Sequence, residues 1–542
     1  MSLFSGTSNL FRLALRTDRL KLVIWIVGCA ATFFASTLSV IAFYNTPEEI
    51  NGYATVSTVS VASRAFNGPI LGATKESVVL TETFSFFTLF VAFMNTLLVV
   101  RHTRQEEETG RAELIGGAAV GAFAPLASTM LLALCVNAVF GLMVAYGYLI
   151  CDFELGGAIL AGASMGLLGM VFASIAALAA QVTQTARAAN AIAGGSIGLF
   201  FLVRAIGDAI GTIQPSGLEV KSSWLTMLSP MGLARETQPF IRDNLWPIWV
   251  LLAIIIVVVA LACILLSRRD LGSGMLSVRP GSPVAPRSLA SALGLVWRQQ
   301  RGLIIGWSIG VILMAVALGS MAKEVEKITS RSEEMSQLIA VLGGSQNLVK
   351  AYLAYSMAIF GVMVTGYAIQ AMQKIRMEES DSRLEMILAG SVRRSSWLLS
   401  NVLVVTFGSV VLLVLCGIAT GVTHGLIVND VQNQIWPMLE AGLVQLPALL
   451  IFVGMFVLIF SVLPKLTMLI SWLLFAACYI VMQFAEIFKL PKWAVDLSPF
   501  SHTPAVPAED LVWSPIITMT AIATLMIIAG VVLFKRRNLT TV

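Results

Sequence analysis

Residues 104–114 read RQEEETGRAEL, and residues 376–386 read RMEESDSRLEM, 272 positions further along the 542-residue chain. An arginine, two glutamates, a second arginine and a third glutamate therefore recur at identical spacing, and we call the two copies the glutamate motifs. Each copy follows the second hydrophobic stretch of its half of the chain, so the sequence predicts an internal duplication. A charged motif repeated at a membrane edge indicates two equivalent docking points for a symmetric partner.

The composition is that of a membrane protein. Hydrophobic residues make up 57% of the chain and charged residues 12%, whereas soluble domains have about half and a quarter. A bilayer core about 30 Å thick needs roughly 20 apolar residues per helix. The sequence therefore predicts an all-α polytopic membrane protein with twelve spans. These lie near 22–44, 83–101, 123–150, 157–181, 188–210, 247–266, 303–322, 352–373, 397–423, 438–463, 466–485 and 514–534.

Further matches extend the duplication over both halves. One set of matches pairs Arg16, Arg19, Trp25 and Gly28 with Arg298, Arg301, Trp307 and Gly310. Another pairs Trp224 and residues 228–230 (LSP) with Trp493 and residues 497–499 (LSP). Each half ends on a basic stop, at residues 268–271 (RRDL) and 536–539 (RRNL). Six spans per copy give both halves the same orientation, so two parallel repeats about a pseudo-two-fold axis along the membrane normal are expected. We predict six-helix halves at 1–266 and 291–542, joined by a cytosolic linker at 267–290 that contains three prolines.

Basic residues set the predicted orientation. Most lysines and arginines fall in segments on the side of the N-terminus, and the positive-inside rule then puts both termini and both glutamate motifs in the cytosol. The net charge of +5 is accounted for by anionic lipid of the inner leaflet. A nucleic-acid partner is therefore not expected.

The sequence offers no reactive or metal-binding constellation. Its six cysteines lie in or at the ends of spans without a CxxC pair, and its three histidines are scattered, so neither a disulfide framework nor a metal site is predicted. No arrangement for nucleophilic or acid–base catalysis is visible, and no GxxxxGK[ST] phosphate loop occurs. We expect a non-enzymatic chain that binds no cofactor of its own.

Ionisable residues are almost missing from the spans. Proton- or sodium-coupled carriers need such groups near the bilayer centre. Arg204 and Asp208, four residues apart near the outer end of the fifth span, are expected to pair with each other rather than to relay protons. A separate ATP-binding protein docking on the glutamate motifs would supply the energy for transport.

Each glutamate motif is predicted to form a short interfacial helix, at about 101–117 and about 373–392. Glu107 with Arg111, and Glu379 with Arg383, have the spacing of an intrahelical ion pair, which stabilises a helix by only a few tenths of a kcal/mol. Replacing Glu107 and Glu379 together is therefore expected to spare folding. The alternative is a solvated loop helix whose charges only mark the membrane edge, although this would not require the same register in both halves.

The order of these features resembles a known family. A basic N-terminal stretch, two spans, a Glu-Glu-x4-Arg motif, four more spans and Arg-Arg-Asp-Leu resemble the second class of ATP-binding-cassette export permeases. Several stretches are similar, more narrowly, to the large fused permeases described as exporters of polyketide antibiotics, the tetronasin-resistance type. They are 228–233 (LSPMGL), 238–240 (QPF), 279–281 (RPG) and 297–302 (WRQQRG). The resemblance covers essentially the whole chain.

The resemblance implies a full pseudo-dimeric permease in a bacterial plasma membrane. It would bind two copies of a separate ATPase subunit, which holds ATP and Mg, and would export hydrophobic small molecules along a path lined by spans one, two and five and their counterparts. The residues implied in coupling to the ATPase are Glu106, Glu107, Arg111, Glu113, Glu378, Glu379, Arg383 and Glu385. Residues 498–502 (SPFSH) depart from 229–233 (SPMGL), so the two outer caps should differ in shape.

Two other functions fit the same sequence. The same architecture could move a lipid or a cell-envelope precursor, or sense a peptide antibiotic. A twelve-span secondary carrier would also have two halves and a central linker. Dependence of transport on a partner ATPase, as opposed to a proton gradient, separates the carrier from the other possibilities.

Overall fold

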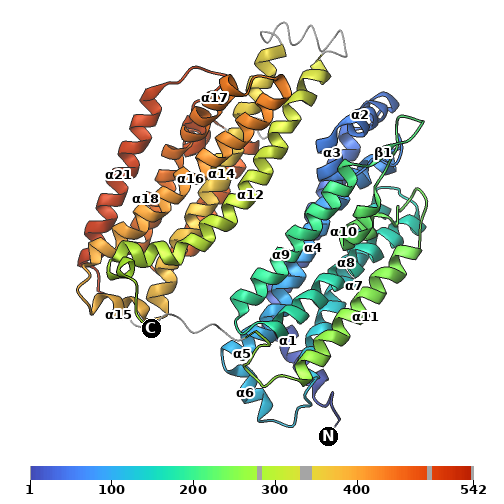
Figure 1. Ribbon diagram of the computed structural model, residues 1–542, viewed down its shortest axis with the longest axis horizontal. Helices are drawn as coiled ribbons and strands as arrows, with labels where there is room; N and C mark the ends of the chain where they lie inside the picture. Colours follow the sequence, from blue (N-terminus) through green and yellow to red (C-terminus); the bar gives the residue numbers. More distant parts are fainter. Residues whose placement is uncertain (1, 277–282, 330–344, 485–490, 539–542) are drawn as a thin grey trace. The chain divides into compact units, whose positions relative to one another are not determined.

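The chain divides into two compact units. The computed structural model describes residues 2–276, 283–329, 345–484 and 491–538 (Figure 1). The first unit comprises Met1–Gly281 and the second Ser282–Val542, so the boundary falls inside the predicted linker. Residues 277–282 of that linker and Leu539 of the second basic stop lie outside the described residues.

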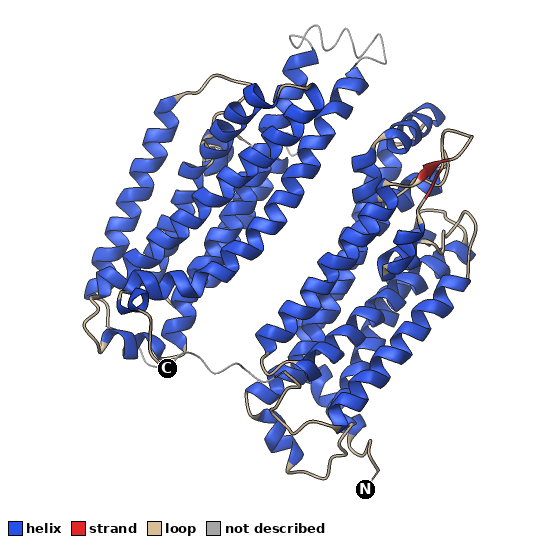
Figure 2. Ribbon diagram, viewed as in Figure 1, coloured by secondary structure: helices blue, strands red, loops and turns tan. Residues whose placement is uncertain are grey.

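Long helices make up most of the first unit (Figure 2). They are α1 (Thr7–Phe43), α4 (Lys75–Val100), α7 (Ala124–Ile150), α8 (Leu155–Val182), α9 (Ala186–Ala209) and α11 (Trp246–Ser267). The shorter elements are α2 (Pro47–Val59), α3 (Val61–Asn67), a π-helical turn η1 (Arg101–Gln105), α5 (Glu106–Glu108), α6 (Arg111–Gly116), β1 (Thr212–Ile213), β2 (Val220–Lys221), η2 (Trp224–Leu228) and α10 (Pro230–Arg235).

The second unit has a similar series of helices. The long ones are α12 (Ala292–Thr329), α14 (Ser345–Ser380), α16 (Arg394–Val428), α17 (Val431–Leu443) followed by α18 (Leu446–Val462), α19 (Thr467–Phe484) and α21 (Trp513–Arg536). The shorter ones are η3 (Arg287–Ala290), α15 (Arg383–Leu388), α20 (Lys492–Val495) and η4 (Pro499–His502).

Eleven helices within the described ranges are long and apolar enough to cross a membrane, with α17 and α18 forming one of them. The predicted span at 466–485 falls on α19, which is apolar over Thr467–Gln483 but shorter than the others in the part that the structure describes. The chain is therefore a mostly helical, multi-pass membrane protein, with eleven candidate spans among the described residues where the sequence predicted twelve.

In the first unit α4 and α8 form the centre. Helix α8 packs against α4, α7, α9 and α11, while α1 packs against α4 and α7. Two asparagines join α4 to α7 inside this core: the Nδ2 of Asn95 lies 2.9 Å from the Oδ1 of Asn137, and the reverse bond measures 2.7 Å. Gly169 of α8 makes room for them, since a Cβ there would lie 1.9 Å from the Asn137 Oδ1. Reciprocal bonding leaves both amide pairs satisfied, as a buried site in a membrane requires.

Packing in the second unit follows the same order. If α12, α14, α16, α18, α19 and α21 correspond to α1, α4, α7, α8, α9 and α11, eight contacts of the first unit recur. The recurring pairs are α12 with α14, α12 with α16, α14 with α16, α14 with α18, α14 with α19, α16 with α18, α18 with α19 and α18 with α21. Each unit therefore buries its helices in the same pairwise arrangement.

The units differ at the end remote from the glutamate motifs. There the first unit carries α2, α3 and an antiparallel hairpin in which Thr212 pairs with Lys221 and Ile213 with Val220 (Figure 2). A bridge between Glu219 and Leu71 joins the hairpin to the segment between α3 and α4. In the described part of the second unit, the segment between α19 and α21 forms the short helices α20 and η4.

Candidate coupling site at the glutamate motifs

A backbone break divides each glutamate motif. In the first unit α4 continues through η1 and α5, and the chain then turns at Gly110 (φ 74°) before α6 begins at Arg111. In the second unit α14 runs to Ser380, and Ser382 (φ 57°) precedes α15, which begins at Arg383. Gly110 and Ser382 occupy the same motif position, and both are left-handed, a conformation that costs any residue but glycine. The predicted single helices at 101–117 and 373–392 are therefore wrong.

The second glutamate of the first motif is held between two arginines. The Glu107 Oε2 lies 2.8 Å from the Arg104 Nη1 and 2.8 Å from the Arg269 Nη1, and the Arg269 Nη2 donates to Oε1. The backbone N–H of Gly272 also donates to Oε2, at 3.3 Å. The Arg104 and Arg269 side chains are only 0% and 3% exposed. We call Arg104, Glu107 and Arg269 the first cluster.

The first cluster fastens three helix ends together. Arg104 continues from α4 and donates through Nε to the carbonyl oxygen of Ala180 in α8, at 2.9 Å. Arg269 follows α11 and donates through Nε to the Oε1 of Gln181, also in α8, at 2.7 Å. Both arginines donate to the carbonyl oxygen of Ser273, at 2.9 Å each. The single carboxylate is thus a counter-charge shared by two buried cations that are themselves anchored to the helix ends.

The second unit builds the same cluster from the equivalent residues. The Arg376 Nη1 lies 3.3 Å from the Glu379 Oε2, and the Arg537 Nη2 pairs with Oε1. The guanidinium of Arg537 also lies over the rings of Phe460 and Phe534, 4.8 and 5.4 Å from their centroids. We call Arg376, Glu379 and Arg537 the second cluster. Arg537 follows α21 as Arg269 follows α11, so the basic stops of both halves supply the second arginine.

These contacts correct the ion pairs expected from helical spacing. Glu107 and Glu379 do not pair with the arginines four residues later. The Arg111 Nη1 instead lies 3.3 Å from the Glu106 Oε1, and the Arg383 Nη2 lies 2.7 Å from the Asp381 Oδ2. Glu379 is buried and the Glu107 side chain is only 10% exposed, so both are anchors within the clusters rather than solvated surface charges.

Neighbouring carboxylates serve other helices. The Glu378 Oε1 accepts a hydrogen bond from the Gln299 Nε2 of α12 at 2.7 Å, and this carboxylate is also buried. The Glu108 Oε2 accepts from the backbone N–H of Ala186, the first residue of α9, at 2.9 Å. Such an acceptor satisfies an otherwise unpaired N–H of the first helical turn. Glu378 and Glu108 therefore help to fix α12 and α9 to the motifs.

Exposed residues lie on the far side of each break. Leu114 in α6 is 81% exposed and Met386 in α15 is 71% exposed, and both hold the same motif position. Glu113 and Glu385, directly before them, and Arg111 and Arg383 are exposed as well. We call α6 and α15 the tip helices. Each presents an apolar side chain beside an arginine and a glutamate, in the same register in both units.

Arg204 and Asp208 lie at the opposite end of the first unit. The Arg204 Nη1 is 3.1 Å from the Asp208 Oδ2, and both side chains are buried. Asp208 also accepts hydrogen bonds from the hydroxyls of Ser222 and Thr226 at 2.8 Å each. Arg204 donates to the carbonyl oxygens of residues 65 and 66 in α3, at 3.0 Å. The pair therefore ties α9 to α3 and to the segment after the hairpin.

Arg235 of α10 extends this network. It donates to the carbonyl oxygens of Asn67 and Pro69 at 2.7 Å each, and burial lowers its pKa to about 10. The described residues contain no group of three or more His, Cys, Asp or Glu side chains placed to hold a metal ion. The hydrogen bonds of Arg204, Asp208 and Arg235 therefore form a structural network that joins α9 and α10 to α3 and to the segment after it.

Comparison with known proteins places the chain among transporters. Over 539 residues it is 31% identical to the multidrug efflux system permease protein Rv1217c of Mycobacterium tuberculosis, which covers 99% of this chain and 95% of that protein. The chain belongs to this family of efflux permeases. A family model for the C-terminal domain of the multidrug efflux system permease Rv1217c matches residues 289–535. In this efflux permease the matched region includes the second glutamate motif and α15. Membership of this family supports the interpretation that the chain is a component of a transporter rather than an enzyme.

Proposed function

We propose that this efflux permease is the membrane subunit of an ATP-driven exporter of the second ATP-binding-cassette class, related to the tetronasin-resistance type. Its two six-helix halves would be parallel repeats about a pseudo-two-fold axis along the membrane normal. Two copies of a separate ATP-binding subunit would dock on the tip helices, and hydrophobic drugs or antibiotics would be extruded. The observation that carries the proposal is the pair of exposed tips in one register, each anchored by a buried cluster.

The clusters give the tips a mechanical role. A partner that binds the exposed Leu114 side chain can displace α6. The first cluster lies directly before α6 and joins the ends of α4, α8 and α11. Displacement of the tip is therefore transmitted to three helices together. Met386 and the second cluster repeat this arrangement in the other unit. In this proposal Glu107 and Glu379 hold the tip helices in place, and the exposed residues beyond each break contact the ATPase.

The membrane-spanning helices support an external energy source. Among the described residues, Arg204 pairs with Asp208, and Asp18 of α1 pairs with Arg101 and His102 at 2.8 and 2.7 Å. Glu82 of α4 accepts hydrogen bonds from Tyr53 and Asn67, and Glu378 of α14 accepts one from Gln299. A carrier driven by protons or sodium needs an ionisable group that is available to its coupling ion. The proposal therefore assigns energy supply to ATP and Mg bound by the partner subunit.

The substrate class follows from the apolar spans. We propose that the transported molecules are largely hydrophobic and neutral or weakly charged. Apolar pockets distinguish similar apolar molecules by only about 1–3 kcal/mol per methylene. Several chemically unrelated amphiphiles should therefore be handled by the same chain.

The test is complex formation with an ATP-binding subunit of the same genome. The chain carrying Leu114→Ser and Met386→Ser should no longer co-purify with the subunit, and drugs should no longer stimulate ATP hydrolysis. A matched control is Leu228→Ser with Leu497→Ser, which removes one exposed leucine from each unit at the end remote from its tip helix. This control should behave as the native chain does. Unchanged co-purification and drug-stimulated ATP hydrolysis with the tip variant would contradict the proposed docking site.

A further inference from the structure

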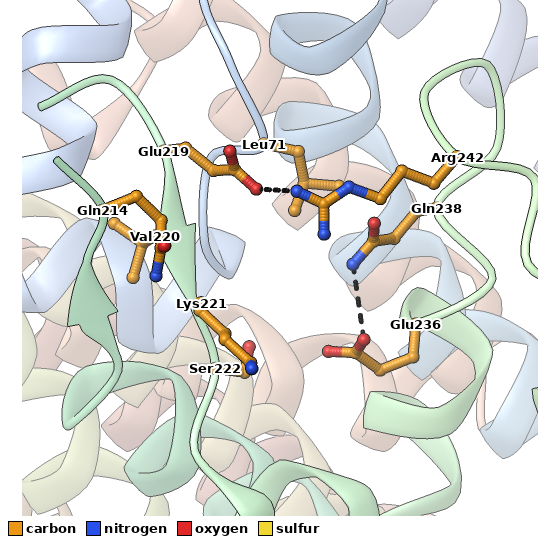
Figure 3. A pocket seen from close by; sticks show the side chains of 9 residues that line it. All are labelled: Leu71, Gln214, Glu219, Val220, Lys221, Ser222, Glu236, Gln238 and Arg242. Carbon is orange, nitrogen blue, oxygen red and sulfur yellow. Dashed lines mark hydrogen bonds and ion pairs between the residues drawn. The ribbon is translucent and has the colours of Figure 1, made fainter. Parts of the chain in front are cut away.

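A polar cavity of about 220 Å³ lies beside the hairpin, at the end of the first unit remote from the glutamate motifs (Figure 1), and Figure 3 shows the side chains that line it. The hairpin contributes Glu219 and Lys221, and the segment after α10 contributes Glu236, Gln238 and Arg242. Typical drug-binding pockets measure about 300–1,000 Å³ and are mostly apolar. This cavity is smaller and lined by charged side chains, so its chemistry suits a small polar solute rather than a hydrophobic drug.

Two of the charged groups in the wall neutralise each other. Arg242 and Glu219 form an ion pair across one side of the cavity (Figure 3). Lys221 is exposed and makes no ion pair with any described residue. The wall therefore offers one unpaired cation.

Glu236 and Gln238 give the other side of the cavity a carboxylate and a side-chain amide. The Nε2 of Gln238 donates to the Glu236 Oε2 at 3.3 Å, as the dashed line in Figure 3 marks. This bond orients the amide, because the flipped form would turn its oxygen towards the carboxylate. Gln238 is 7% exposed, yet its Oε1 accepts no hydrogen bond. A buried acceptor without a donor is unfavourable, and Figure 3 shows this oxygen on the side of the amide that faces Arg242 rather than Glu236.

The charge of Glu236 is also incompletely compensated. Burial raises the pKa of Glu236 above its ordinary value, nearby Asp208 raises it further, and Arg235 opposes both effects. A bound cation would stabilise the ionised carboxylate.

We propose that this cavity binds a small zwitterion, with its ammonium group against Glu236 and its carboxylate or phosphate against Lys221. Charge-assisted hydrogen bonds of this kind are stronger than neutral ones. The ligand could be a free amino compound or the headgroup of a zwitterionic lipid, since both present the same two charges.

The second unit does not repeat this chemistry. At the offset of 269 that aligns Trp224 with Trp493, Ala505 stands for Glu236 and Pro507 for Gln238. We therefore expect one binding site per chain. A site found in one half alone is separate from the duplicated elements on which the proposed transport function rests, so the failure of either proposal leaves the other intact.

The test is calorimetric titration of the full chain in nanodiscs made of phosphatidylglycerol, which carries no ammonium group. The probes are 4-aminobutyrate and phosphoethanolamine, with butyrate and butylamine as ligands that each carry one of the two charges. The zwitterions should bind at one equivalent per chain, and the singly charged ligands should bind about tenfold more weakly or not at all, since each lacks one charged contact.

Near-isosteric variants locate the site. Glu236→Gln and Lys221→Met should each weaken binding of 4-aminobutyrate about tenfold or more. Glu509→Gln and Lys492→Met change exposed residues between α19 and α21 of the second unit and should leave it unchanged. Matching gel-filtration profiles and tryptophan emission would show that the variants are folded.

Nanodiscs that also contain phosphatidylethanolamine distinguish the two sources of ligand. Competition with the soluble zwitterion would identify the lipid headgroup as the occupant, and undiminished binding would identify a free solute. The proposal is overturned if no zwitterion binds the native chain, if butyrate or butylamine binds as tightly, or if the two cavity variants bind normally.

Discussion

Removing Glu107 should destabilise the first unit far more than removing its neighbour Glu106. Glu107→Ala leaves the guanidiniums of Arg104 and Arg269 buried without a counter-charge, although their bonds to α8 and Ser273 remain. Breaking a buried ion pair in this way costs about 3–5 kcal/mol. In the control, Glu106→Ala removes a pair whose Arg111 partner is 64% exposed, and such a pair contributes about 0.2–1 kcal/mol.

Thermal unfolding of the purified chain measures the difference. With about 2–4 °C per kcal/mol for a domain of some 150–250 residues, Glu107→Ala should lower the midpoint by roughly 6–20 °C. Glu106→Ala should lower it by no more than a few degrees. Adding Arg269→Met to Glu107→Ala removes one of the stranded cations and should recover part of the loss. Equal shifts for the two single variants, or no recovery in the double variant, would refute the buried-cluster reasoning.

Three further predictions concern packing, topology and transport. Gly169→Ala should lower the unfolding midpoint, because its Cβ would lie 1.9 Å from the Asn137 Oδ1 and such overpacking costs about 1–3 kcal/mol; an unchanged midpoint would show that the site relaxes freely. Cysteines replacing Ser216 and Ser501 should react with an impermeant thiol reagent added to intact cells, whereas one replacing Ser380 should be protected; the reverse pattern would invert the predicted orientation. Co-expression with an ATPase partner should raise resistance to more than one amphiphile, and a catalytically dead partner should abolish it; full resistance from the chain alone would exclude ATP-driven export.

The positions of the spans could be predicted from the sequence because membrane helices need long apolar stretches. The prediction was least accurate at 466–485, where α19 is shorter in the described residues than the other spans. The break in the first motif had a signal in Gly110, but Ser382 occupies the same left-handed position in the second motif without one. Local spacing therefore suggested a continuous helix in both copies.

The clusters were hidden for a different reason. Helical periodicity reveals partners three or four residues apart, whereas Arg269 is 162 residues from Glu107. The matching basic stops at 268–271 and 536–539 were the available signal, because duplicated arginines suggest duplicated partners. The cavity around Glu236 had no comparable signal, since neither a repeat nor a known spacing connects the hairpin to the segment after α10.

The unequal ends of the two units show what fusion into one polypeptide permits. In a homodimer, every substitution appears in both subunits, so a hairpin or a polar cavity would be acquired twice. In a single gene with two copies of an ancestral segment, selection can act on either copy alone. The first unit carries α2, α3 and the hairpin, and the second has α20 and η4 in the corresponding described segment, while both retain the arginine–glutamate clusters. A chain with two unlike ends can therefore hold one binding feature per molecule, which a homodimer would present twice.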